Sequence, residues 1–284
     1  MGGQRIDNLL GVMQGRLLPK YKGFYQAHPV GYWQDEFKLA AQLGLDCIEF
    51  ILDYNDYDNN PLMSRQGREQ IYSITENIGV HVCSVCADYF MVAPLHTDNK
   101  QITTQSTKVL INLLNAASDL GIKDVVIPCV DQSSIQHEGL RDRFTDVLLT
   151  IVPEAEQCNV NLSLETDLEP IQFEKLLTTL DSPRVTVNYD TGNSAALGYD
   201  YKDELSAYGD RISDVHIKDR VLGGGPVILG TGNADIPGFF ETLRSYNYRG
   251  PLIMQAYRDD EGISVFQDQL NWLRKNVLSL WPAV

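Results

Sequence analysis

The regular alternation of eight short apolar runs with amphipathic segments is the feature that most constrains the fold of this chain. The runs have a strand-like composition and lie at residues 9–14, 46–51, 81–87, 124–129, 161–165, 185–190, 213–218 and 252–256. The segments between them have helical spacing, and two of them end on Gly44 and Gly121, a common signal for the end of a helix. One strand and one helix in every segment of about 25–40 residues predict parallel βαβ connections.

Eight such units in 284 residues predict an α/β protein whose strands close into a (β/α)8 barrel, the TIM barrel. No Ser-, Gly- or Pro-rich linker divides the chain, so we expect a single TIM-barrel domain over residues 1–284. A doubly wound sheet is the alternative, but its first turn would normally carry G-x-G-x-x-G, which "MQGRLLPKYKGFYQ" lacks. The long insertions after the first, second, third and seventh strands would lie at the C-terminal face, where barrels build active sites.

The net charge and the cysteine content limit which classes of partner and which cell compartment are expected. A net charge of −15 disfavours nucleic acid and anionic membranes as partners. No apolar run approaches about 20 residues, and the first residues lack a secretory signal pattern. The odd number of cysteines, five, fits free thiols in a reducing compartment, so we expect a cytoplasmic protein. Cys83 and Cys86 form a C-x-x-C inside a strand pattern without a second pair, which favours core packing over redox or metal chemistry.

Each of the last four strand-like runs carries one polar residue near its C-terminal end. These are Glu165 in "NLSLE", Asp190 in "VTVNYD", His216 in "SDVHIK" and Gln255 in "PLIMQA". In a closed barrel these ends converge, and a buried carboxylate there needs a cation or hydrogen-bond donors. The set predicts one divalent ion, Mn²⁺, Zn²⁺, Co²⁺ or Mg²⁺, among which ligand type does not choose. Taken singly, a strand-end carboxylate can instead cap the next helix, and a strand histidine can be structural.

Several segments resemble the xylose isomerase-like TIM barrel superfamily along nearly the whole chain. "SLETDL", "YDTGNSAALGYD", "DVHIKDR" and "GTGNADIPGFFETL" occur in the order and near the spacing of that superfamily, and "LGLDCIEF" places Glu49 in its familiar acidic position. The superfamily includes sugar and sugar-phosphate isomerases and epimerases, inosose-processing enzymes and the endonuclease IV group. The resemblance implies metal ligands Glu, Asp, His and Glu, which correspond here to Glu165, Asp190, His216 and Gln255.

Two positions depart from the pattern that the resemblance implies. The 3-epimerases of the family use two metal-bound carboxylates as bases on opposite faces of a sugar carbon, whereas Gln255 is an amide that accepts no proton at neutral pH. Glu165 alone could still move a proton next to a carbonyl, giving isomerisation, or dehydration if a β-hydroxyl leaves. Asn193 stands where several relatives carry a histidine, which argues for one metal ion rather than a cluster.

These observations predict a divalent-metal-dependent isomerase of a sugar or sugar phosphate. The alternatives are a keto-sugar 3-epimerase, an inosose-type dehydratase, or a sugar-binding barrel without turnover, which Gln255 would favour. An endonuclease is disfavoured because, of the five histidines, only His216 is well placed, with His96 the other that could face the site. The expected partner is a small sugar, and the resemblance leaves a homo-oligomer open. The sugar, its phosphorylation and the metal are not identified by the sequence.

Further polar residues are expected around the site. We expect Lys218, in "HIKD", to act in catalysis by holding a hydroxyl or anion of the substrate, with a rim salt bridge as the alternative. The expected substrate contacts are Glu49, Asn193, Arg16 and Arg258, although each arginine alone is often a surface residue. The glycine-rich "VLGGGPVILGTGN" at residues 221–233 predicts either a phosphate-binding loop or a lid.

Overall fold

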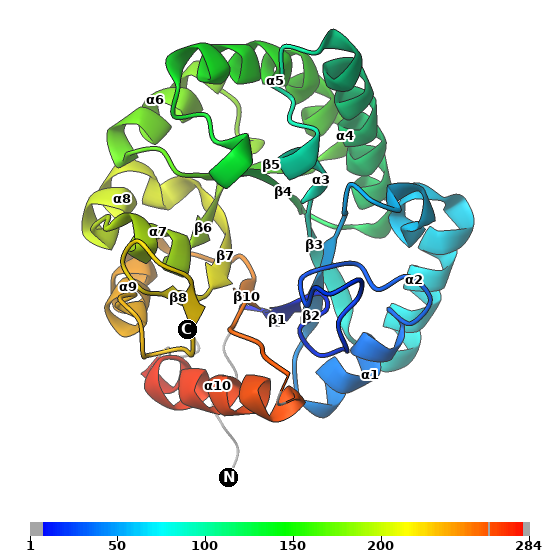
Figure 1. Ribbon diagram of the computed structural model, residues 1–284, viewed down its shortest axis with the longest axis vertical. Helices are drawn as coiled ribbons and strands as arrows, with labels where there is room; N and C mark the ends of the chain where they lie inside the picture. The colour runs from blue at the N-terminus through cyan, green and yellow to red at the C-terminus, as the bar shows by residue number, and fades with distance from the viewer. Residues whose placement is uncertain (1–7, 261, 281–284) are drawn as a thin grey trace.

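The computed structural model describes residues 8–260 and 262–280, and eight parallel strands form a closed barrel at its centre (Figure 1). The order around the barrel is β1-β10-β7-β6-β5-β4-β3-β2. The bounds are β1 Leu10–Met13, β2 Cys47–Ile51, β3 His81–Cys86, β4 Asp124–Cys129, β5 Asn161–Thr166, β6 Val185–Asp190, β7 Ile212–Ile217 and β10 Leu252–Met254. The predicted (β/α)8 barrel is therefore confirmed, because a doubly wound sheet would leave two open edges.

Helices surround the barrel and connect its strands (Figure 1). They are α1 Asp35–Gln42, α2 Arg65–Ile78, α3 Tyr89–Val92, α4 Lys100–Leu120, α5 Glu138–Cys158, α6 Pro170–Leu180, α7 Thr191–Leu197, α8 Tyr201–Tyr208, α9 Ile236–Leu243 and α10 Ile263–Asn276. Short 3₁₀ turns lie at Tyr57–Asn59, Pro61–Met63, Asp131–Ser133, Gly209–Arg211, Arg244–Tyr246 and Leu278–Leu280. In the part of the chain that the structure describes, no helix has both the length and the apolar character needed to cross a membrane.

Local sequence signals determine where the long helices begin and end. The α4 helix begins at Asn99, whose side chain accepts hydrogen bonds from the next turn, and ends at Gly121 with a φ of +72°. The α2 helix has the same arrangement, with Ser64 as its N-cap and Gly79, with a φ of +79°, after its last turn. These caps bring each helix to a stop near the point where the next strand begins.

Apolar packing occupies two separate regions. The larger core lies where the outward-facing strand residues meet the helices, and it includes the aromatic side chains of Trp33, Phe37 and Phe50, which pack edge to face. A smaller cluster inside the barrel contains Met13, Cys47, Ile51, Cys86, Val126 and Ile253. Because the inner cluster is small, inward-facing polar side chains from β5, β6 and β7 fill much of the remaining barrel interior.

Three details of the C-terminal face were not expected. β10 ends at Met254, so Gln255 follows the strand instead of belonging to it. The short helices α3 and α7 occupy the connections after β3 and β6. The glycine-rich segment begins with a two-stranded antiparallel hairpin, β8 Asp219–Arg220 with β9 Pro226–Val227.

Candidate active site

The C-terminal ends of β5, β6 and β7 bring three of the four predicted metal ligands together. Glu165, Asp190 and His216 each offer one ligand atom, and these atoms lie within 4.8 Å of one another. The parallel register pairs Asp190 directly with His216 on the neighbouring strand. All three side chains are buried, so two carboxyl groups and one imidazole lie close together inside the barrel at its C-terminal end.

Asp190 both caps a helix and faces this group. Its Oδ1 accepts hydrogen bonds from the backbone N–H groups of Gly192 and Asn193, each 2.8 Å long, at the start of α7. Its Oδ2 lies 3.5 Å from Nζ of Lys218. A side chain at position 192 would be crowded, because a Cβ there would lie 2.8 Å from Cγ of Lys218. The glycine therefore lets α7 start directly above β7, with Asp190 and Lys218 in contact.

Asn193 holds Glu165 in place. Its Nδ2 donates a hydrogen bond to Oε1 of Glu165, and its Oδ1 accepts one from Nη1 of Arg220 at 2.8 Å. Burial raises the pKa of Glu165 to about 7, and the negative charge of Asp190 acts in the same direction. A carboxylate with a pKa near neutrality suits a group that must both take up and release a proton.

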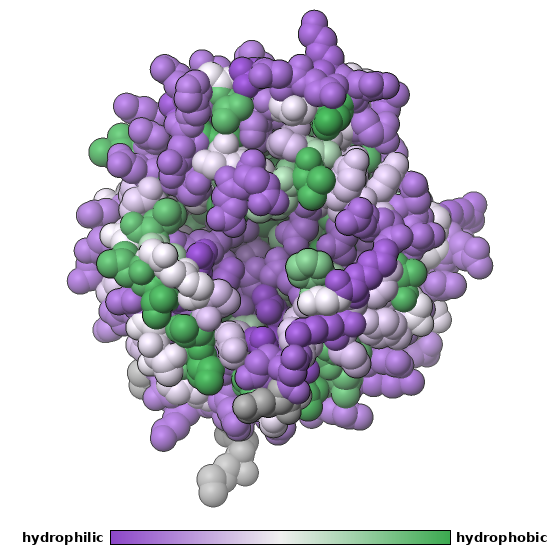
Figure 2. All heavy atoms as spheres, in the orientation of Figure 1, coloured by the Kyte–Doolittle hydropathy of each residue, from purple (hydrophilic) through white to green (hydrophobic). Residues whose placement is uncertain are grey.

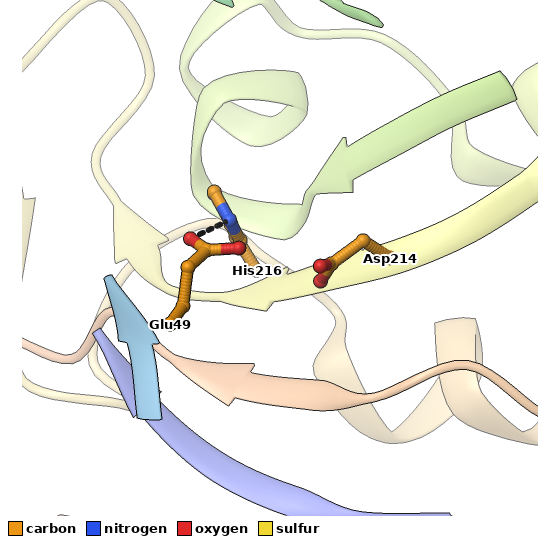
Figure 3. A group of neighbouring side chains, drawn as sticks. All are labelled: Glu49, Asp214 and His216. Atoms are coloured by element: carbon orange, nitrogen blue, oxygen red, sulfur yellow. Dashed lines mark hydrogen bonds and ion pairs between the residues drawn. The ribbon is translucent and has the colours of Figure 1, made fainter. Parts of the chain in front are cut away.

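Glu49 binds His216 from below, inside the barrel (Figure 3). Nε2 of His216 and Oε1 of Glu49 are 2.7 Å apart, and the hydroxyl of Ser84 donates a 2.6 Å hydrogen bond to the other carboxylate oxygen. Burial alone would lower the pKa of His216, but the charge of Glu49 outweighs it and raises the pKa to about 9. This pairing leaves Nδ1 of His216 without a partner among the described residues.

Asp214 stands beside this pair and was missed in the sequence analysis (Figure 3). It is fully buried, and burial followed by the charge of Glu49 raises its pKa well above the ordinary value. Residues two apart on a strand point to the same face, so His216 itself signalled that Asp214 faces the barrel interior. The structure thus places a further buried carboxyl group, Asp214, next to Glu49 and His216.

Gln255 faces the same end of the barrel but bonds to another amide. Its Nε2 donates a 2.9 Å hydrogen bond to Oε1 of Gln26, in the loop after β1. The same Oε1 also accepts a 2.8 Å hydrogen bond from Nη2 of Arg16, while Nε2 of Gln26 donates to Asp88. The carbonyl oxygen of Gln255 is buried and has no partner within the described ranges. A buried carbonyl oxygen without a donor is a ready ligand for a cation.

The structure does not bring Arg16, Arg258 or Glu49 to the wall of the pocket. The guanidinium of Arg16 is turned to Gln26 and the backbone carbonyl of Arg16 accepts a hydrogen bond from Nε of Arg258. The guanidinium of Arg258 lies 4.5 Å from the ring centre of Tyr25. Glu49 is completely enclosed. Internal partners, rather than the open pocket, therefore determine where these three side chains point.

A pocket of about 380 Å³ opens above the cluster, and Figure 2 shows it as a hollow lined with hydrophilic side chains. Its floor includes Glu165, Asn193, Lys218 and Gln255. The loops after β1, β2 and β3 line the walls as the long insertions predicted, and the loop after β4 also lines them, which was not expected; the segment after β7 adds Arg220. The volume lies in the range of small-molecule sites.

The glycine-rich segment is fastened by one carboxylate. Oδ2 of Asp219 accepts hydrogen bonds from the N–H groups of Gly230 and Gly232, both 2.9 Å long, and Oδ1 accepts one from Ala234 at 3.0 Å. These backbone donors are thus bound to Asp219 rather than turned to the pocket. Arg220, which directly precedes the segment in β8, lines the pocket wall.

The donor set fits a divalent metal ion. Two carboxylates, the unpartnered Nδ1 of His216 and the unpartnered oxygen of Gln255 supply oxygen-rich ligands with one nitrogen. Glu49 would fix the imidazole tautomer that presents Nδ1, as carboxylates do for metal-binding histidines. His96 packs against Phe144 with ring centres 5.9 Å apart and is not part of the pocket wall.

The comparison with known proteins identifies the family. The sequence profile of the xylose isomerase-like TIM barrel family matches residues 37–276. The chain belongs to this family. It is 30% identical over 247 residues to an L-ribulose-5-phosphate 3-epimerase of Salmonella heidelberg, covering 84% of this chain and 87% of that protein.

Solved structures of xylose isomerase-like barrels share the fold. D-psicose 3-epimerase from Clostridium cellulolyticum, bound to D-tagatose, superposes with a TM-score of 0.74 at 15% identity, over 95% of this chain and 99% of that one. A xylose isomerase-like TIM barrel protein from Mycobacterium smegmatis in complex with magnesium gives a TM-score of 0.71 at 16% identity, over 96% and 97%. At these identities the likeness concerns the fold.

Proposed function

We propose that this barrel catalyses the 3-epimerisation of a ketose or ketose phosphate with the help of one divalent metal ion. The Salmonella heidelberg relative, which aligns with 84% of the chain, is a ketose-phosphate 3-epimerase, and the chain is accordingly an enzyme that acts on a sugar. The observation that carries the mechanism is the buried group of Glu165, Asp190 and His216, from which Glu165 lines the pocket. A sugar-binding barrel without turnover is therefore not retained.

Glu165, Asp190, His216 and Gln255 would hold the metal ion, which when bound would polarise the carbonyl group of the substrate. Glu165 removes the proton from the carbon next to that carbonyl, and Asn193 keeps its carboxylate oriented toward the pocket. Lys218 lines the pocket with its ammonium group, which can stabilise negative charge on a substrate oxygen. Glu49 acts indirectly by orienting His216.

Aldose–ketose isomerisation is the second candidate function. Gln255 favours it, since the amide provides no second base beside Glu165. In that reaction one carboxylate moves the proton between neighbouring carbons on the same face of the sugar. The two candidates give different products, so one experiment separates them.

The test follows proton exchange and product formation by NMR in heavy water. The protein is supplied with Mn²⁺, Co²⁺, Mg²⁺ or Zn²⁺ and given L-ribulose 5-phosphate or unphosphorylated L-ribulose. We expect the C3 epimer, with deuterium at C3, and the matched pair of substrates tells whether the phosphate is needed. An aldose product would support isomerisation instead. Neither exchange nor product with any metal would overturn the proposed function.

Two variants connect the activity to the site. Glu165→Gln should lower the rate by about 10²–10⁴-fold, the usual contribution of a general base. Glu174→Gln is the matched control, because it makes the same change on the exposed surface of α6. Elemental analysis should find one divalent ion per wild-type chain and less in His216→Ala.

We also propose a cytoplasmic location and a small sugar as the partner, without nucleic acid or membrane. The five cysteines are free thiols, and three of them are buried, which suits a reducing compartment. The net charge of −15 opposes binding to polyanions. Retention of the protein on heparin or DNA at physiological salt would contradict this assignment.

A further inference from the structure

Epimerisation with inversion at one carbon needs a proton donor on the face opposite to the base, and position 255 does not supply it. Gln255 is an amide, and its Nε2 is committed to a hydrogen bond with Gln26. The inference below rests on the proposed 3-epimerisation, since a single-base isomerase needs no second group. A second acid–base group would therefore lie elsewhere on the described part of the pocket wall.

The row of hydrogen bonds that begins at Gln255 ends on such a group. Oε1 of Gln26 accepts from Gln255, and Nε2 of Gln26 donates to Oδ2 of Asp88 at 3.1 Å. Asp88 follows directly after β3, at the same C-terminal face of the barrel as Glu165. Both carboxyl groups line the one pocket, together with the two glutamines. The carboxyl group that is missing from position 255 is thus present two hydrogen bonds away.

The surroundings of Asp88 suit proton transfer. Its second oxygen accepts a 3.3 Å hydrogen bond from the thiol of Cys86, and the ion pairs of residues 8–260 and 262–280 do not include Asp88. Burial raises its pKa above the ordinary aspartate value, which brings it closer to neutrality. A carboxyl group whose hydrogen bonds come from neutral donors can change its protonation state at modest energetic expense.

Glu165 and Asp88 are held from different sides of the pocket. Asn193, from the connection after β6, fixes Glu165, whereas Gln26, from the loop after β1, fixes Asp88. In the closed barrel β4 separates β3 from β5, and Pro128 of β4 lines the pocket between them. The two carboxyl groups therefore line the same pocket from positions two strands apart around the barrel.

We infer that Asp88 is the second catalytic acid–base group of the reaction and replaces the carboxylate that position 255 lacks. The Glu165 carboxylate takes the proton from C3, and the C–H electron pair moves to form the enediolate with its negative charge on the C2 oxygen. The Asp88 carboxyl group then delivers its proton to the opposite face of C3 as the C2 carbonyl re-forms. Exchange with water returns a proton to Asp88 and removes one from Glu165, so the enzyme ends as it began.

The experiment measures two reactions of L-ribulose 5-phosphate in heavy water by NMR, with Mn²⁺ present. One is exchange of the C3 proton with solvent, and the other is formation of the C3 epimer. Wild type should exchange the C3 proton and form the epimer. Asp88→Asn should form the epimer about 10²–10⁴-fold more slowly than wild type. It should still exchange the C3 proton of the epimer whose proton faces Glu165. Asp146→Asn is the matched control, because it makes the same change on the exposed surface of α5 and leaves the pocket unaltered.

A gain of function tests the same inference. Adding Gln255→Glu to Asp88→Asn restores a carboxyl group at the family position and should recover part of the epimer formation. If Asp88→Asn does not fold, the isosteric pair Asp88→Glu and Asp88→Gln separates the carboxyl group from its volume. The glutamate variant should then convert substrate at least tenfold faster than the glutamine variant.

Three results would overturn the inference while leaving proton transfer by Glu165 intact. They are epimer formation by Asp88→Asn at the wild-type rate, equal rates for Asp88→Glu and Asp88→Gln, and exchange without epimer formation in wild type. Loss of both exchange and conversion in a folded Asp88→Asn protein would also reject it, since Asp88 would then serve binding. A wild-type protein that neither exchanges nor converts would instead remove the proposed function itself.

Discussion

The buried pair of His216 and Glu49 makes a quantitative prediction about folding. Replacing Glu49 by alanine should lower the free energy of unfolding of the metal-free protein by about 3–5 kcal/mol, the usual effect of breaking a buried ion pair. Glu49→Gln should have a smaller effect, about 1–2 kcal/mol, because the amide oxygen can still accept the hydrogen bond from Nε2 of His216.

The magnitude follows from the surroundings of the pair. Neither side chain is exposed, so water can neither screen the charges nor replace a lost partner. Alanine removes the 2.7 Å contact with His216 and the 2.6 Å hydrogen bond from Ser84 together. Each buried donor left without an acceptor costs about 1–3 kcal/mol. Burial, the largest cause, still raises the pKa of the neighbouring Asp214 when Glu49 is gone, so Asp214 is a poor replacement for the lost carboxylate.

The assay is urea unfolding at pH 7 after dialysis against EDTA, followed by far-ultraviolet circular dichroism and tryptophan fluorescence. Glu69→Gln is the control, because Glu69 pairs with Arg65 on the exposed surface of α2 and should unfold at the wild-type urea concentration. A loss below about 1 kcal/mol in Glu49→Ala would refute the reasoning that this pair supports the barrel interior. With metal restored, Glu49→Gln should bind it about 10–100-fold more weakly.

Three further predictions concern elements around the site. Burial raises the pKa of Glu36 to about 7 from 4.5, so its contribution to stability is greatest below pH 4.5 and falls by about 3 kcal/mol as pH rises to 7. The free energy of unfolding of Glu36→Gln, measured by urea titration, should therefore rise relative to that of wild type by this amount between pH 4.5 and pH 7. A difference between variant and wild type that does not change with pH would contradict this. Gly192→Ala should push α7 away from Lys218 and lower kcat/KM by about 10²-fold, and an unchanged value would mean that the 2.8 Å approach relaxes freely. Asp219→Asn should leave loop N–H groups unpaired, destabilise the protein by at least about 2 kcal/mol and speed hydrogen exchange at Gly230 and Gly232. Wild-type exchange at these two amides would contradict the last prediction.

The candidate site was partly predictable because strand ends in a parallel barrel share one face. Glu165, Asp190 and His216 could be aligned from their own strands without any knowledge of loops. The same rule holds for the third strand-like run, residues 81–87, which Asp88 follows directly, but Asp88 was not among the predicted site residues. The expectation for Arg16 and Arg258 depended on loop paths, which local patterns do not encode.

The sequence by itself determined the barrel and the family. Strand and helix periodicity are local properties, and eight repeats of them allow few ways to bury every apolar face. The organisation of the chain as one domain over residues 1–284 stays a prediction.

Only the tertiary structure decided which polar groups meet. His216 bonds to Glu49 across 167 positions, Gln255 to Gln26 across 229 and Gln26 to Asp88 across 62. Such pairs depend on barrel closure, strand register and the path of each loop, and a shift of one residue would turn a side chain to the opposite face. The orienting role of Glu49 and the inferred role of Asp88 therefore became visible only once the barrel was closed.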